Sequence, residues 1–305
     1  MKIWGTREPG RALQPAGESC SYNRVLMTTD LTEFAALVAP EIPDEKLDLL
    51  RAALAYARPE YPELDAEKFV RKVDDFAERV RQQRGPIEDA AHTLASLNRV
   101  LFHEEGLSGN HENFYDPRNS YLNEVLERRL GIPITLSVVY MEVAARAGLP
   151  VAGVGLPGHF LLKHFDPAGH QVFIDPYSAG KLMSPAECQV RMDEVFGGKM
   201  TMRSEFLHSV SKRQILTRML NNLRGIYVST RNFRKALTVL DFILAIHPRS
   251  PDDLRQRALL RYNEGMLRGA VNDLEEYLRV APEASDAEEM KQTAIAIRRS
   301  IAMMN

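Results

Sequence analysis

Apolar residues recur at helical spacing through the first hundred residues. Between residues 44 and 102 they fall three or four positions apart, which is the spacing of one face of an α-helix. Pro59 and Pro62 separate a first stripe from a second, and Gly85-Pro86 ends the second stripe. We therefore predict a helical packing unit over this region. The two stripes are Leu47, Leu50, Ala53, Leu54 and Ala57, and then Phe69, Val73, Phe76, Ala77 and Val80.

The period changes in the middle of the chain. A helix that begins near residue 119 is broken at residues 131–133 and is followed by a long apolar helix that ends at residue 147. After a second break at residues 148–150, the runs VAGVGL and VFID are typical of short strands. Helix returns after Ser184, which is expected to cap it. The pattern predicts a mostly helical α+β fold in which a small antiparallel sheet packs on the helix of residues 135–147.

The last third of the chain contains an internal repeat of 34 residues. This is the period of the tetratricopeptide repeat, so we predict two repeats over residues 217–250 and 251–284, followed by a capping helix over 286–303. Arg257 and Arg261 depart from the pattern, because apolar or aromatic residues are expected at their positions. The repeats would form either a peptide-binding groove or a support that packs on the preceding domain. The matching pairs are Ala236 and Ala270, Leu240 and Leu274, Ile243 and Tyr277, and Pro248 and Pro282.

Length and composition limit the possibilities. A chain of 305 residues is long enough for two domains, and we place them at residues 27–205 and 213–305. Residues 1–26 are rich in Gly, Pro, Arg and Ser, so we expect a disordered tail. The net charge of −2 provides no overall attraction to nucleic acid or to an anionic membrane. Two cysteines without metal-ligand spacing favour a reducing compartment, and no apolar run is long enough to span a bilayer. We expect a cytoplasmic protein without a bound metal or cofactor.

His159 and Asp175 are the first candidates for a functional site. The histidine opens an apolar run and the aspartate closes the next one, sixteen residues later, with turn residues between them. Residues placed in this way lie side by side in an antiparallel pair, where the carboxylate can hold the imidazole in one tautomer. Cysteine enzymes of this general layout carry their thiol at the start of the buried helix. That segment reads PITLS here and has no cysteine, so Thr135 and Ser137 are the alternative nucleophiles.

Other polar residues between the helices have two interpretations. Asn110, His111, Asp116 and Asn119 could bind a metal or line a site, but Asn, Asp and Gly in such a loop more often form turns. We therefore expect no metal here. Cys188 lies within a predicted amphipathic helix, and we expect a buried, inert thiol rather than the missing nucleophile.

Arg128 and Arg129 lie on the helix that leads into the break at residues 131–133. The spacing of Glu124 and Arg128 favours a solvated ion pair on the helix surface. If one arginine instead turns toward His159, it would offer a fork for a carboxylate or a peptide C-terminus. Asn119, Arg128 and Arg129 are therefore our candidates for peptide or ligand binding.

These motifs together resemble a known family. The string NSYLNEVLERRLGIPITLSVVYMEVAARAGLP, the PGHF at 157–160, the IDP at 174–176 and the two trailing repeats are similar to bacterial SirB-type proteins. Such proteins carry a transglutaminase-like domain, of the papain-like thiol-enzyme superfamily, followed by tetratricopeptide repeats. The resemblance implies a Cys, His and Asp site, in which His159 and Asp175 match the family His and Asp. The family Cys falls near residues 133–135, and this sequence departs from the family pattern there.

Two functional hypotheses follow. The one that we favour is a non-enzymatic transglutaminase-like protein that binds a protein or peptide partner in a scaffold or regulatory role, with His159 and Asp175 as part of a polar pocket. The alternative is a hydrolase or acyl-transferase of papain-like geometry in which Thr135 or Ser137 replaces the thiol. A hydroxyl needs an aligned base and an oxyanion hole to act as a nucleophile, so its distance from His159 discriminates the two hypotheses.

Overall fold

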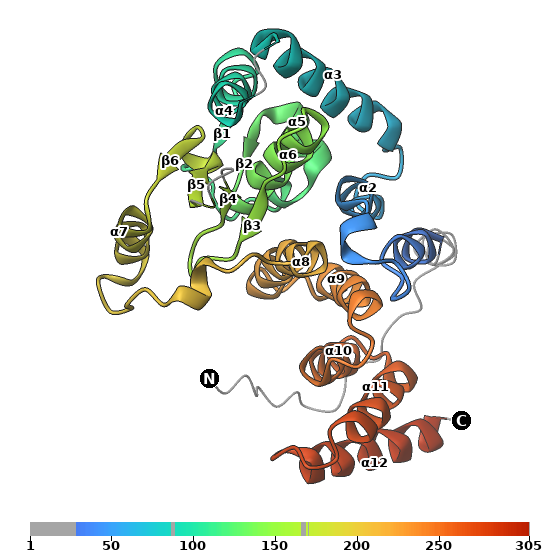
Figure 1. Cartoon of the computed structure of the whole chain (residues 1–305). Coiled ribbons are helices and arrows are strands. Elements are labelled where there is room, and N and C mark those ends of the chain that lie inside the picture. The colour runs from blue at the N-terminus through green and yellow to red at the C-terminus, as the bar shows by residue number, and fades with distance from the viewer. Residues whose placement is uncertain (1–28, 87–88, 166–168, 170, 305) are drawn as a thin grey trace.

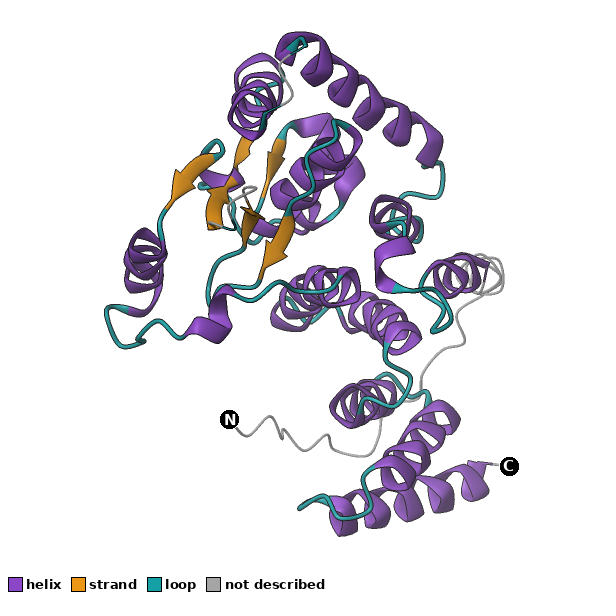
Figure 2. Ribbon diagram, in the orientation of Figure 1, coloured by secondary structure: helices purple, strands orange, loops and turns teal. Residues whose placement is uncertain are grey.

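The computed structural model describes residues 29–86, 89–165, 169 and 171–304. The tail predicted at residues 1–26 lies outside the described residues. The predicted class is confirmed, because the chain is mostly helical with small sheets (Figure 2). None of the helices in the described part is both long enough and apolar enough to cross a bilayer.

The N-terminal part is a helical unit, as the two apolar stripes predicted. A helix over residues 29–37 precedes η1 (Asp44–Lys46), α2 (Leu49–Ala55), α3 (Ala66–Arg84), α4 (Ala90–Asn98) and the π-helix η2 (Arg99–Glu104). All ten stripe residues are buried. Asp48, Asp65 and Asp89 cap α2, α3 and α4 by accepting a hydrogen bond from a first-turn backbone N–H, which explains where these helices begin.

The central part is built around one buried helix. η3 (Pro117–Ser120) and α5 (Leu122–Arg128) lead into α6 (Pro133–Arg146), and α6 packs against β3 (Ala152–Val154) and β4 (Leu161–Phe165). β5 (Gln171–Asp175) and β6 (Lys181–Met183) complete an antiparallel sheet in the order β3-β4-β5-β6. The predicted packing of a small antiparallel sheet on this helix is therefore observed.

Some strands were not predicted. β1 (Ser108–Gly109) and β2 (Leu130–Gly131) form a short parallel pair, and β6 extends the main sheet beyond β5. Strands of two or three residues are too short to show an alternating pattern. His159 was expected to open a strand, but β4 begins two residues later and the histidine lies in the turn after β3.

A helix and a short connection join the sheet to the repeats. α7 (Pro185–Phe196) begins at Ser184, which forms a capping box with Glu187. η5 (Ser204–Leu207) then leads to α8 (Lys212–Ser229). The domain boundary between residues 205 and 213 stays a prediction; this stretch contains the end of η5 and the first residues of α8.

The C-terminal part consists of helix pairs, as the 34-residue period predicted. α8 and α9 (Phe233–Ile246) form one pair, α10 (Pro251–Asn263) and α11 (Leu267–Val280) form the next, and α12 (Ala287–Met304) follows them. Figure 1 shows this series of helices extending away from the part that holds the sheet. Three of the four repeated pairs are buried in the helix interfaces: Ala236 and Ala270, Leu240 and Leu274, and Ile243 and Tyr277.

The two arginines that break the repeat pattern are held by carboxylates. Arg257 pairs with Asp241 at 2.6 Å and with Asp273 at 2.7 Å. Arg261 contacts the same two aspartates at 3.2 Å and 2.8 Å. A four-residue ion network therefore replaces apolar packing where α9, α10 and α11 meet.

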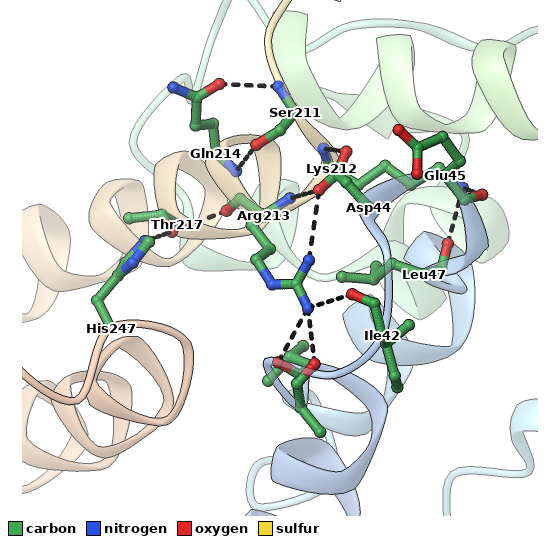
Figure 3. Close-up of polar contacts among 12 residues, drawn as sticks. Ile42, Asp44, Glu45, Leu47, Ser211, Lys212, Arg213, Gln214, Thr217 and His247 are labelled. Atoms are coloured by element: carbon green, nitrogen blue, oxygen red, sulfur yellow. Dashed lines mark hydrogen bonds and ion pairs between the residues drawn. The ribbon is translucent and has the colours of Figure 1, made fainter.

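The first repeat shares its core with the N-terminal unit. Buried residues of α8 such as Leu216 belong to the same apolar cluster as Leu47 of the helical unit. Around this cluster, Arg213 donates hydrogen bonds to the backbone oxygens of Ala39 and Ile42 at 2.7 and 2.8 Å, and the backbone N–H of Lys212 donates to Asp44 at 2.8 Å (Figure 3). The first repeat thus packs on the preceding domain, one of the two arrangements expected from the sequence.

Candidate functional site

His159 and Asp175 are in contact. The Nε2 atom of His159 lies 2.9 Å from Oδ1 of Asp175, and the two side chains are buried. Gly158, at φ +70°, makes the turn that places the histidine, and a Cβ there would lie 2.6 Å from Val195. Asp175 ends β5 and caps the following η4 (Pro176–Ser178). Because Nε2 faces the carboxylate, Nδ1 is the ring atom that remains for a second partner.

The Asp175 carboxylate has three further partners. Its oxygens accept hydrogen bonds from the backbone N–H of Tyr177 at 3.1 Å, from the Ser178 hydroxyl at 2.9 Å and from Arg191 at 3.0 Å. Burial by itself would raise the pKa of this carboxyl. The hydrogen bonds from His159 and Ser178 and the charge of Arg191 outweigh that effect and hold the pKa below its ordinary value. The carboxylate is therefore ionised and fixed in place.

Sequence reasoning missed two arginines at this site. Arg191 belongs to α7 and donates a hydrogen bond to Asp175 at the end of β5. Arg218 belongs to α8 and donates to the backbone oxygens of Leu156 and His159 at 3.1 and 2.7 Å. The only available signal was that a buried carboxylate needs hydrogen-bonding partners, which does not say which residue supplies them.

The two hydroxyls proposed as nucleophiles do not hydrogen-bond to His159. Thr135 Oγ1 accepts a hydrogen bond from the backbone N–H of Ile132 at 3.0 Å and lies 2.8 Å from the backbone oxygen of Asn119, to which it donates. It therefore caps the start of α6. Ser137 Oγ is buried and has no hydrogen-bond partner among the described residues. The structure brings His159 and Asp175 together but joins neither hydroxyl to them.

An aromatic side chain, Tyr177, packs against the histidine instead. The Tyr177 ring packs edge-on against His159 with their centroids 6.0 Å apart. The Tyr177 hydroxyl lies 3.1 Å from Nδ1 of His111, and the Phe114 ring packs edge-on with the Tyr177 ring, with the centroids 6.4 Å apart. Burial and the nearby Asp175 raise the pKa of the tyrosine, which therefore stays neutral. Tyr177 thus connects the His159–Asp175 pair to the loop of residues 110–116.

Close packing beneath Tyr177 requires glycine at position 109. A Cβ built there would lie 2.4 Å from the tyrosine ring. We expect Gly109→Ala to displace Tyr177 and to lower the free energy of unfolding by about 1 to 3 kcal/mol, the usual cost of overpacking. Gly225→Ala is the matched control: the position is an exposed one within α8 with open space around it, so alanine should stabilise the chain by about 0.5 to 1 kcal/mol. Urea denaturation measures both, and equal effects would show that Gly109 is not packed as described.

The other three candidates lie around that loop. Asn119 is fully buried, and its amide donates to the backbone oxygens of Asn113 and Phe114 at 2.7 and 3.2 Å. Arg128 is partly buried, and its Nη2 lies 3.7 Å from Asp116, so the predicted solvated pair with Glu124 is not what the described residues form. Arg129 ends α5 at φ 62° and lies 3.6 Å from Glu105 on the exposed surface. Neither arginine has a contact with His159 among the described residues.

Neither Cys188 nor a cluster of metal-binding side chains adds to the site in the described part of the chain. Cys188 is completely buried in a small apolar cluster with Phe173 and Met192. Burial, followed by the charges of Glu187 and Asp175, raises the pKa of its thiol to about 11, so it is a protonated and unreactive group at neutral pH. In the described part of the chain, no three His, Cys, Asp or Glu side chains lie close enough together to hold a metal ion.

Comparisons with known proteins agree with this architecture. The model of the transglutaminase-like superfamily matches residues 67–221, and that of the tetratricopeptide repeat matches residues 223–294. A UPF0162 protein of Xylella fastidiosa is 40% identical over 245 residues, which cover 79% of this chain and 86% of the relative. Human F-box only protein 21 is 30% identical over 193 residues, which cover 59% of this chain and 29% of that protein.

One solved structure has a weaker likeness. It is a structure of menin, which its title describes as revealing the binding site for Mixed Lineage Leukemia protein. The match covers 87% of this chain and 73% of the menin chain, with 11% sequence identity and a TM-score of 0.38. The matched families and the fold agree with the SirB-type resemblance of the sequence. This chain belongs to the transglutaminase-like superfamily, as a UPF0162 protein in which the transglutaminase-like domain is followed by tetratricopeptide repeats.

Proposed function

We propose that this chain is a non-enzymatic transglutaminase-like protein that binds a protein or peptide partner in a scaffold or regulatory role. The observation that supports the proposal most is the hydrogen bonding of the two hydroxyls at the start of α6, where the family thiol would lie. Thr135 Oγ1 is committed to backbone groups, and Ser137 Oγ is buried without a contact to His159. Acyl transfer through a covalent acyl-enzyme requires a side-chain nucleophile aligned with the base. The tetratricopeptide repeats support the same proposal, because such repeats generally bind other proteins.

The buried pair has a different role in this proposal. His159, Asp175 and Arg191 form one hydrogen-bonded group, and Tyr177 packs on its histidine. In this proposal the group holds Tyr177 in place, and the entropic cost of binding is smaller because these side chains are already ordered when the partner arrives. A cytoplasmic location and the absence of a cofactor are part of the proposal.

The second candidate is a hydrolase or acyl-transferase with Thr135 or Ser137 as nucleophile and His159 and Asp175 as base and orienting group. One observation favours Ser137 over Thr135: its Oγ has no hydrogen-bond partner among the described residues, so it is not committed elsewhere. Catalysis would require this fully buried hydroxyl to reach both the substrate and the imidazole.

A turnover screen separates the two candidates. The purified chain is assayed with activated acyl esters and glutamine peptides, with and without an amine donor, beside Ser137→Ala, Thr135→Ala and His159→Ala. We expect no turnover above the His159→Ala background. Turnover that is lost in His159→Ala and in either hydroxyl variant, while thermal unfolding shows each variant folded, would establish the enzyme instead. Cross-linking in the native cells tests the binding role. A partner protein that is cross-linked to the wild type, and is recovered in a smaller amount with His159→Ala, would support it.

A further inference from the structure

Two exposed aromatic residues stand on the loop that follows β1. Tyr115 is 78% exposed and Phe114 is 39% exposed, and their rings pack edge-on with centroids 5.3 Å apart. They line an open pocket of about 510 Å³ together with Glu112, Asn113, Asp116 and Arg118. Large aromatic side chains exposed next to each other are costly in water and are enriched in binding surfaces. This surface, residues 112–118, is here called the aromatic loop.

Buried amides hold the aromatic loop in its shape. Asn110 accepts from the backbone N–H of Asn113 at 3.0 Å and donates to Asn119 at 3.1 Å. Asn119 in turn donates to the backbone oxygens of Asn113 and Phe114. Asn110 and Asn119 are both buried. The exposed rings are thus carried by a loop that is rigid before any partner binds, which lowers the entropic cost of binding.

The loop is continuous with the candidate site. Phe114 packs on Tyr177, and Tyr177 packs on His159, so the exposed rings and the buried pair form one aromatic series. A partner on the aromatic loop would therefore contact a side chain that packs on Tyr177, the neighbour of His159. Asn119, a candidate from the sequence, contributes here by holding the loop rather than by touching the partner.

The charged side chains that line the pocket indicate the charge of its partner. Its lining carries two carboxylates, Glu112 and Asp116, against one guanidinium, Arg118. Asp116 pairs with Arg118 at 2.7 Å and also lies 3.7 Å from Arg128, so its charge is already compensated. Glu112 is exposed and has no ion pair among the residues that the structure describes. An unpaired carboxylate beside aromatic faces favours a cation, because the ring faces attract positive charge and the carboxylate completes its neutralisation.

We infer that the aromatic loop binds a lysine or arginine side chain of a peptide segment in the partner protein. The ammonium or guanidinium group lies against Phe114 and Tyr115 and pairs with Glu112. This inference rests on the proposed binding function and names the chemistry of the partner and the surface that recognises it.

The test is a selection of random twelve-residue displayed peptides against the whole chain. Peptides that survive should be enriched in lysine or arginine, and synthetic copies should lose at least about tenfold in affinity for the Phe114→Ala/Tyr115→Ala variant. Glu112→Gln should weaken binding about two- to fivefold, with a smaller difference at high salt because the contact is exposed. Tyr262→Ala is the matched control, since Tyr262 is an aromatic residue 46% exposed on the repeat helix α10. It should bind as the wild type does.

Each other outcome overturns the inference in a recognisable way. Peptides without basic residues would show that the partner chemistry is wrong. Peptides that bind Tyr262→Ala more weakly but bind the double variant normally would show that the binding surface lies on the repeats, and the proposed function would still hold. If no peptide is enriched, the inference that the aromatic loop binds a peptide is wrong. Turnover that depends on His159, with basic peptides still bound through Tyr115, would overturn the proposed function and leave this inference intact.

Discussion

Replacing Asp175 with alanine should lower the free energy of unfolding by about 3 to 5 kcal/mol, the usual cost of removing one partner from a buried charged pair. The carboxylate is completely buried, and its loss leaves the Arg191 charge and the His159 ring without their shared acceptor. Urea denaturation measures the change. Asp175→Asn keeps the shape and one acceptor oxygen, so it should lose less. A stability for Asp175→Ala within 1 kcal/mol of the wild type would show that this network is not formed in solution.

The same residue should make stability depend on pH in the acid range. The pKa of Asp175 is lower in the folded chain than its ordinary value of about 3.9, so the folded state binds the proton less readily than the unfolded state. The stabilising contribution is therefore fully present above the unfolded pKa and is lost as pH falls through the folded pKa. The difference in unfolding free energy between the wild type and Asp175→Asn should be constant from pH 7 to pH 5 and should shrink below pH 4. A constant difference throughout would contradict the shift.

Replacing Asp273 with alanine should destabilise the repeats by about 3 kcal/mol. Asp273 is buried, and its removal leaves the guanidinium groups of Arg257 and Arg261 with Asp241 as their one remaining acid partner among the described residues. Two cations on one carboxylate in a partly buried interface are poorly compensated. Denaturation followed by hydrogen exchange should show α10 and α11 losing protection before the sheet does.

Two further variants give this prediction its controls. Glu276→Ala removes an exposed partner of Arg279 on the same helix α11, and exposed pairs contribute little, so no measurable change is expected. Replacing Asp241 and Asp273 by leucine and Arg257 and Arg261 by methionine removes all four charges together and should restore most of the stability lost in Asp273→Ala. If the quadruple variant were less stable than Asp273→Ala, loss of an uncompensated charge would not be the cause.

Much of the fold could be predicted because the information is local. The buried stripes around Leu47 and Phe69 were evident from helical spacing alone, and the 34-residue period located the helix pairs of the repeats. Both signals come from positions within one or two helices. The short strands β1 and β2 could not be predicted, since they pair with each other across the intervening residues 110–129. β6 pairs with its neighbour in sequence, β5, but its three residues are too few to show an alternating pattern.

The candidate site was predictable only in its centre. The spacing of His159 and Asp175 in two consecutive apolar runs placed them together, although the histidine lies in the turn before its strand. Thr135 and Ser137 looked equivalent in the sequence because both are hydroxyls at the start of α6. Their surroundings differ in the structure, where one caps the helix and the other faces the packed interior.

The sequence by itself determined the helical unit, the repeat period and the His159–Asp175 pair, because helical period, repeat length and strand spacing are properties of neighbouring residues. Only the tertiary structure decided which distant side chains complete them. Arg191 and Arg218 meet the pair from α7 and α8, and the carboxylates of Asp241 and Asp273 explain the two arginines that break the repeat pattern. The partner of a buried charge is chosen by which helices pack together, and no local spacing contains that choice.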